Sequence, residues 1–145
     1  MTTAYARRRH PSTSIDSTRV AETMHRGVVT CRPDATLSTV ARLLAAHRIH
    51  AVIVAPEGDG EDWGIVSDLD LAAALSEGSL GVTAGEISSE PSLFVTPDET
   101  LARVAQLMHE YDAHHVVVLG RGSRRPVGIV STLDIADVVA ELSQL

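Results

Sequence analysis

One seven-residue phrase occurs twice in the sequence, and this duplication constrains the fold more than any other feature. The phrase reads Gly-Ile-Val-Ser-Asp-Leu-Asp from Gly64 and Gly-Ile-Val-Ser-Thr-Leu-Asp from Gly128. The copies start 64 positions apart (128 − 64), and this offset aligns residues 19–75 with residues 83–139 at 19 identities in 57 pairs. Two copies of so long a period do not suit a solenoid. The sequence therefore predicts two small units packed as one body.

The periodicity of apolar residues predicts the same order of elements in each unit. In the first unit we expect a helical turn at 20–24, a strand at 28–31, a helix capped by Asp34 or Thr36 that ends near 48, strands at 51–55 and 63–66, and a helix at 68–77. In the second unit we expect a turn at 84–87, a strand at 93–95, a helix at 100–112, strands at 115–119 and 127–131, and a helix at 132–142. The expected fold class is α+β, with a small β-sheet packed against two α-helices in each repeat.

Composition excludes several kinds of partner. The 145 residues are 44% hydrophobic but only 3% aromatic, so the core must consist of Val, Ile, Leu and Ala. A net charge of −7 and the few aromatic residues argue against nucleic acid as the main partner.

No apolar run is long enough for a membrane span or an export signal. Residues 1–18 are polar and basic, which predicts a flexible N-terminal arm. Cys31 is the single cysteine, which excludes an internal disulfide and favours a cytoplasmic location.

The repeated phrase places polar groups at the junction of a strand and a helix. Ser67 and Ser131 end the strands, so the first amides of the following helices and the positive ends of their dipoles favour an anion there. Asp70 and Asp134 fall in the first helical turns, and a carboxylate can accept both hydrogens of a vicinal diol. Together these groups describe a nucleoside-phosphate site. The same Ser-x-x-Asp spacing also describes a capping box, in which serine and acid satisfy the helix end. The spacing leaves both interpretations open.

The doubled pattern of strand, helix, strand, Gly-Ile-Val-Ser-x-Leu-Asp and helix resembles the CBS domain (cystathionine beta-synthase domain), and the pair resembles a Bateman module. The resemblance covers about residues 20–142, with CBS repeats at 19–80 and 81–145. It implies two repeats related by a pseudo-twofold axis that bind adenosine derivatives in two clefts. Relatives usually carry a proline near the middle of the second strand, whereas Ile53 and Val117 stand there in this chain.

The resemblance also implies which residues bind the ligand. The serines would contact phosphate and the aspartates would hold ribose, while the base would lie against the first strand and the start of the second strand of the other repeat. The first predicted set is Ser131 and Asp134 with Val29, Ile49 and His50. The second predicted set is Ser67 and Asp70 with Leu93, Ala113 and His114.

Other chemistry has weaker support in the sequence. The chain has seven histidines, but none is spaced as in a His-x-x-x-His zinc motif, and the acidic loop at 56–62 lacks the ligand spacing of a calcium loop. Cys31 has no local pattern of a matched base, so we expect no catalytic residues and no metal site. 

The predicted function is therefore regulatory, not enzymatic. We expect a module that requires no cofactor, binds AMP, ADP or ATP, and forms a homodimer. Because no effector domain is fused to it, we expect its own dimer or a separate effector protein to respond to the bound nucleotide. The alternatives are a structural or dimerisation module without nucleotide, or a module for S-adenosylmethionine or a metal ion.

Overall fold

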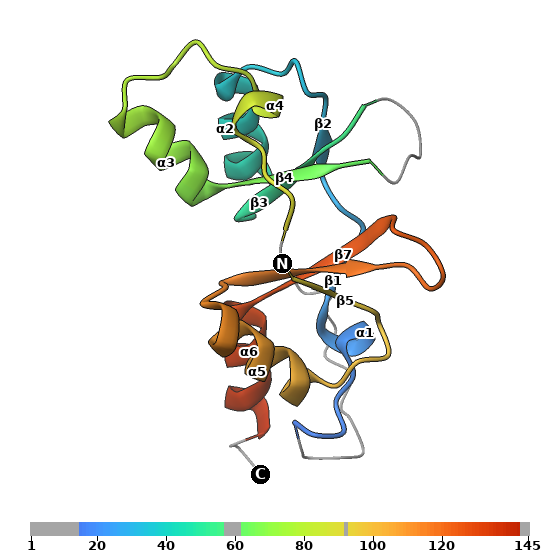
Figure 1. Cartoon of the computed structure of the whole chain (residues 1–145). Helices are drawn as coiled ribbons and strands as arrows, with labels where there is room; N and C mark the ends of the chain where they lie inside the picture. Colours follow the sequence, from blue (N-terminus) through green and yellow to red (C-terminus); the bar gives the residue numbers. More distant parts are fainter. Residues whose placement is uncertain (1–14, 57–61, 92, 143–145) are drawn as a thin grey trace. The chain divides into compact units, whose positions relative to one another are not determined.

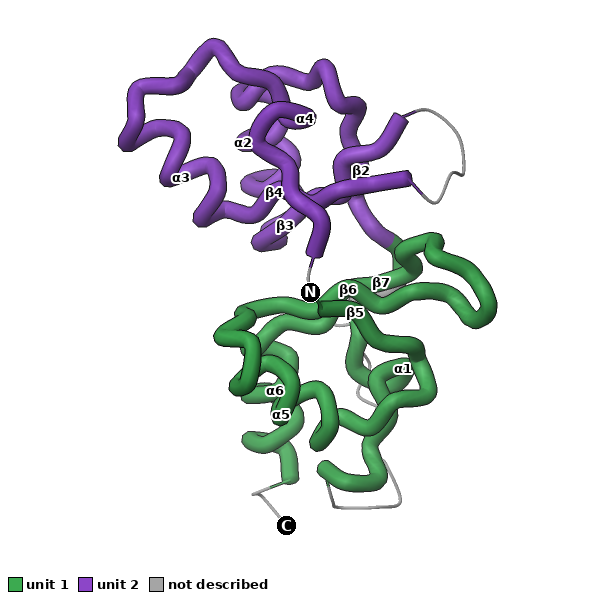
Figure 2. Tube along the Cα trace, viewed as in Figure 1, with its two compact units in different colours: residues 1–27, 93–145 green, residues 28–92 purple. Residues whose placement is uncertain are grey.

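The computed structural model describes residues 15–56, 62–91 and 93–142. These residues form two compact units, shown in different colours in Figure 2. Unit 1 takes its residues from 1–27 and 93–145, and unit 2 consists of 28–92. The units therefore differ from the sequence repeats at their edges, because the start of the chain belongs to the same unit as its C-terminal half.

Unit 2 is a three-stranded sheet with helices on one face (Figure 1). Its elements are β2 (Thr30–Cys31), α2 (Leu37–His47), β3 (Ala51–Val54), β4 (Gly64–Ser67), α3 (Asp68–Ser76) and α4 (Ala84–Ile87). β3 is the central strand, parallel to β2 and antiparallel to β4. All four residues of β3 are buried, which explains why this strand is a continuous apolar run instead of an alternating one. 

Unit 1 repeats this plan and adds one strand. Its elements are α1 (Val20–Thr23), β1 (His25–Arg26), β5 (Phe94–Val95), α5 (Leu101–Tyr111), β6 (His115–Leu119), β7 (Pro126–Ser131) and α6 (Thr132–Leu142). The sheet order is β1-β7-β6-β5, and β1 pairs with β7 antiparallel through His25–Ile129 and Arg26–Gly128. The sequence did not predict this two-residue strand. None of the helices in the described ranges has the length and apolar run that a membrane span requires.

The long helices α2 and α5 begin and end at equivalent residues of the two repeats. Thr36 caps α2 by accepting a hydrogen bond from the Thr39 amide, and Thr100 caps α5 in the same way through Arg103. At the other ends, Arg48 and Asp112 adopt left-handed conformations with φ of 54° and 52°. The predicted helices are thus confirmed, and their ends differ from the prediction by one residue.

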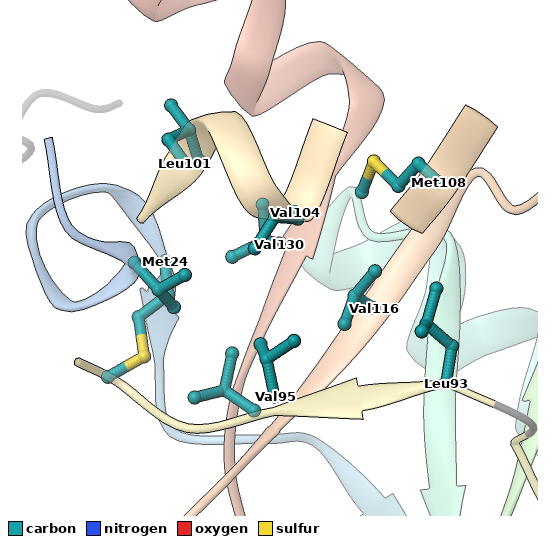
Figure 3. Close-up of a cluster of buried hydrophobic side chains, with 10 residues drawn as sticks. Met24, Leu93, Val95, Leu101, Val104, Met108, Val116 and Val130 are labelled. Atoms are coloured by element: carbon teal, nitrogen blue, oxygen red, sulfur yellow. The ribbon is translucent and has the colours of Figure 1, made fainter. Parts of the chain in front are cut away.

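Each unit has a core of aliphatic side chains. In unit 1, Val104 and Met108 of α5 lie over the strand residues Val130 and Val116 (Figure 3), and Leu101 belongs to the same buried cluster. The spacing of these helix residues is that of one buried face. Unit 2 has the equivalent cluster around Val40, Leu44, Val52, Val54 and Val66. The expected core of Val, Ile, Leu and Ala is confirmed for most of these side chains. Met24 and Met108 also belong to the unit 1 cluster, and the aromatic side chain of Trp63 is buried as well.

Ile53 and Val117, the two positions at which the resemblance led us to expect proline, lie in β3 and β6. The Ile53 amide donates a hydrogen bond of 2.9 Å to the Val29 carbonyl, and Val117 pairs with Phe94 of the neighbouring strand. Proline has no amide hydrogen and cannot donate such a bond. Ile53 therefore gives β3 a main-chain hydrogen bond at this position that proline could not make.

A short helix from each sequence repeat packs in the unit formed by the other repeat. α1 precedes the first repeat's strands, yet the side chain of Val20 is fully buried in the core of unit 1. The amides of Val20 and Ala21 donate to the carbonyls of Glu99 and Pro97 at 2.9 and 3.0 Å. Residues 1–14 of the predicted arm lie outside the described residues. Thr18 is only 1% exposed, so ordered contacts begin before residue 19.

The reciprocal contact holds α4 in unit 2. The amides of Ala84 and Gly85 donate to the carbonyls of Ala35 and Pro33, each at 2.8 Å. Ala84 is fully buried, and isolated bridges join Thr36 to Thr83 and Ile65 to Ser89. Both contacts use the same Pro-Asp turn of the repeat, at Pro33 and at Pro97. The exchange is therefore part of the duplicated fold.

The exchange predicts which fragments fold. Residues 28–92 retain α4 and its bridges, so we expect this fragment to unfold cooperatively on heating, as followed by circular dichroism. Residues 19–80 match the first sequence repeat but lack α4, which would leave the core around Val40 and Leu44 uncovered, so we expect no cooperative transition. Equal melting of the two fragments would show that the exchanged helix does not stabilise the unit.

Candidate functional site

The first candidate site begins where β4 passes into α3. Ser67 ends β4 and lies opposite Ala51 of β3. The Ser67 amide donates a hydrogen bond of 2.8 Å to Oδ2 of Asp70, and the Asp70 amide donates one of 3.1 Å to Oγ of Ser67. These reciprocal bonds form a capping box. The short connection is possible because the strand's last residue is also the helix cap.

The second candidate site has the same geometry where β7 passes into α6. The Ser131 amide donates to Oδ2 of Asp134 at 2.7 Å, and the Asp134 amide donates to Oγ of Ser131 at 3.2 Å. Oγ of Ser131 also lies 3.1 Å from Oδ2 of Asp134 and donates its hydrogen to it. Asp134 is 6% exposed. This carboxylate is therefore the more enclosed of the two.

The structure bears on both interpretations of the Ser-x-x-Asp phrase. The capping box is confirmed at Ser67 and at Ser131, and in each case it uses one carboxylate oxygen, Oδ2. Within the described part of the chain, Oδ1 of Asp70 has no hydrogen-bond partner. A capping box therefore leaves an acceptor at Asp70 for a ligand hydroxyl. Contact of these carboxylates with ribose stays a prediction.

The helix amides are more heavily used than the sequence predicted. Besides the capping box, the Asp68 amide donates to the His50 carbonyl at 2.8 Å, and the Thr132 amide donates to the His114 carbonyl at 2.9 Å. Among the described residues, the amides of Leu69 and Leu133 have no acceptor. Each helix end thus offers one main-chain donor instead of several, and its capacity for phosphate is smaller than we expected.

A side-chain pair that the sequence did not indicate lies beside Ser67. Nδ1 of His50 is 2.8 Å from Oδ2 of Asp68, and the two side chains are 60% and 51% exposed. The equivalent residues in the second repeat are His114 and Thr132, and a threonine cannot form an ion pair. Comparison of the two copies of the phrase would have found this position, because Asp68 and Thr132 are their one difference.

The structure assigns the other predicted site residues to different environments. In unit 2, Val29 and Ile49 are half-buried and pack against the core cluster, whereas His50 is exposed. In unit 1, Leu93 is 8% exposed and belongs to the core, Ala113 packs against it, and His114 is exposed. Each predicted set combines residues of both units, and the composition of the two sets stays a prediction.

Metal and nucleophile chemistry find little support in the described residues. In these ranges no group of three His, Cys, Asp or Glu side chains is arranged to hold a metal ion. Most of the acidic loop, 57–61, lies outside them. Burial raises the pKa of the Cys31 thiol above its usual value, which disfavours the reactive thiolate.

The family of the chain follows from a comparison with family models. The model of the CBS domain matches residues 20–77 and again residues 84–141. This chain belongs to the CBS domain family. Both matches include a strand–helix junction with its Ser-x-x-Asp capping box, so the junction described above is the duplicated core of a CBS domain pair.

One curated relative is similar along most of this chain. The uncharacterized protein MJ1404 of Methanocaldococcus jannaschii is 28% identical over 142 residues, which cover 88% of this chain and 33% of that protein. The chain thus spans about a third of the length of this curated relative. 

Among solved structures, the CBS domain pair of protein MJ0100 in complex with 5'-methylthioadenosine and S-adenosyl-L-methionine is similar at a TM-score of 0.76 and 27% identity, covering 86% of this chain and 97% of that one. Hypoxic Response Protein I with two coordinated zinc ions is similar at a TM-score of 0.67 and 27% identity, covering 83% and 98%. The α+β fold predicted for the two repeats is confirmed.

The different enclosure of the two carboxylates predicts different costs of removing them. Asp134→Ala removes an acceptor from both the amide and the hydroxyl of Ser131, whereas Asp70→Ala removes an acceptor from the Ser67 amide alone. We expect losses of about 2 kcal/mol for Asp134→Ala and about 1 kcal/mol for Asp70→Ala in the free energy of unfolding. Urea denaturation measures both, and equal losses would contradict the difference in hydrogen bonding.

Proposed function

We propose that this chain is a regulatory module that binds adenosine derivatives at its two Ser-x-x-Asp junctions. The observation that carries the proposal is the carboxylate that each junction presents in a CBS domain, with Oδ2 committed to the cap and, at Asp70, Oδ1 open to a ligand hydroxyl. A ribose offers two neighbouring hydroxyl groups as donors. The cap fixes the carboxylate in place, so little side-chain entropy is lost when a sugar binds.

The similar CBS pair of MJ0100 supports the adenosine class. Its complex contains 5'-methylthioadenosine and S-adenosyl-L-methionine, two molecules that share adenosine but differ in charge and carry no phosphate. One free amide at each helix end is a modest phosphate site. AMP, ADP and ATP remain proposed ligands, and the non-phosphorylated derivatives are proposed beside them on an equal footing.

The module would act by a difference in affinity between two arrangements of its parts, since a ligand that binds both equally shifts nothing. We propose no catalytic residue for it. The protein that responds to ligand binding would be a second copy of the chain or a separate effector protein. Exposed apolar side chains on the helices that follow the junctions suit a homodimer, namely Leu69, Leu75, Leu133 and Val139.

A structural module without ligand is the second candidate, and the capping boxes are the observation that favours it. The Ser-x-x-Asp phrases already have a role in ending strands and starting helices. In that case the phrase would be retained for folding alone. Ligand binding to the whole chain separates the two candidates.

The conversion of the carboxylates to amides tests ribose binding with little damage to the caps. In Asp70→Asn and Asp134→Asn the amide oxygen can still accept from the serine amide, while an NH₂ group replaces the other carboxylate oxygen and cannot accept. We expect the double variant to bind AMP and 5'-methylthioadenosine at least tenfold more weakly at each site, the scale of a hydrogen bond to a charged group. Isothermal titration calorimetry measures the loss.

The matched control is Asp137→Asn, which changes an exposed acid of α6 outside its first turn. We expect it to bind as the parent does. For the parent chain, ligand at 100 times its Kd should add about 2.7 kcal/mol of stability. Unchanged affinity in the double variant would overturn the ribose assignment, and a parent chain that neither ligand stabilises would favour the structural module.

A further inference from the structure

The two junctions share their fold but differ in charge. The first turn of α3 carries two acidic residues, Asp68 and Asp70, whereas the first turn of α6 carries one, Asp134. The difference arises at a single aligned position, Asp68 against Thr132 (132 − 68 = 64). Everything else in the two phrases is identical, so this residue is the natural place for the two sites to diverge in ligand preference.

Asp68 lies between the two groups that a ligand would meet at this helix end. The residue before it is the cap Ser67, and the residue after it supplies the free amide of Leu69. Its side chain is 51% exposed, and its own amide is held by the His50 carbonyl at 2.8 Å. The main chain of Asp68 is therefore held in place, and its half-exposed carboxylate stands on the residue next to the Leu69 amide, beside His50.

The side chain of Asp68 pairs with that of His50. Nδ1 of His50 lies 2.8 Å from Oδ2 of Asp68, and no arginine is paired with Asp68 in the described chain. The α6 junction has the hydroxyl group of Thr132 at the same position. The first turn of α3 therefore carries one carboxylate more than the first turn of α6.

We propose that Asp68 is a specificity-determining residue that makes the two adenosine sites unequal. The junction of Ser67 and Asp68 takes an adenosine derivative without phosphate, either neutral or with a cationic sulfonium group. The junction of Ser131 and Thr132 takes a phosphorylated one. This inference rests on the proposed function and deepens it, because like charges repel a phosphate at α3 while the helix dipole and the Leu133 amide attract it at α6.

Exchange of the two residues tests the inference, and both exchanges are tolerable because each residue already stands at that position of the fold. Calorimetric titrations of the full chain at pH 8 and low salt would use AMP and 5'-methylthioadenosine as probes. For the parent we expect AMP to fill one site more tightly than the other. Asp68→Thr should raise the affinity of the weaker AMP site about fivefold, and Thr132→Asp should lower that of the stronger site about fivefold. The affinity for uncharged 5'-methylthioadenosine should change less than twofold.

Three controls separate charge from shape. Asp68→Glu retains the charge and should retain the inequality of the two sites. Asp34→Ala removes another exposed acid of unit 2, paired with Arg32 at 3.4 Å, and should leave both AMP affinities unchanged. In 0.5 M NaCl the fivefold effects should shrink, because salt screens charges that are exposed to solvent, whereas an effect of side-chain shape would persist.

The outcomes are distinguishable. Equal filling of both sites by AMP, or equal shifts of AMP and 5'-methylthioadenosine in Asp68→Thr, would overturn the role of Asp68 and leave the proposed function standing. Failure of the parent chain to bind either probe would overturn the proposed function, and the inference with it.

Discussion

The reciprocal hydrogen bonds between serine and aspartate at the strand–helix junctions are the interaction on which the functional geometry depends. They let the last residue of β4 or β7 serve as the cap of the next helix, so no loop separates strand from helix. They also decide what is left for a ligand. Two of the four amides at each junction bond within the capping box, and a third bonds to a histidine carbonyl. Most of the amide donors that make a helix end an anion site are therefore hydrogen-bonded within the fold. The carboxylate is the main polar group that each junction has left for a ligand.

The exchanged short helices impose a second constraint. A three-stranded sheet with two helices leaves part of its core uncovered, and Val20 and Ala84 fill that part from the other repeat's sequence. The chain must therefore pass between the units twice, at residues 27–28 and at residues 92–93. Duplication alone would give two independent domains, whereas exchange makes each unit depend on both repeats.

The sequence predicted the repeated elements well because their signals are local. The apolar spacing of α2 and α5, the threonine caps and the β-branched strands each lie within a few residues, and the duplication gave every prediction a second instance. The pairing of His25–Arg26 with β7 was missed because a two-residue strand has no periodicity and its partner lies about a hundred residues away. The site was overestimated for a related reason. The amides of Asp68 and Thr132 donate to the carbonyls of His50 and His114, which come directly before β3 and β6, and the helix sequence alone does not show these bonds.

The two copies of the phrase differ at one position, and at this position the main chain accepts either residue. Positions that hold the backbone are kept in both repeats: the serine, the aspartate, and the histidine whose carbonyl receives the helix amide. Asp68 and Thr132 make the same main-chain bond to a histidine carbonyl, so the backbone of the junction accepts either residue. Their side chains differ in charge, and Asp68 also pairs with His50 in a contact that Thr132 does not make. A duplicated module can in this way acquire two different ligand preferences from one architecture by a single substitution.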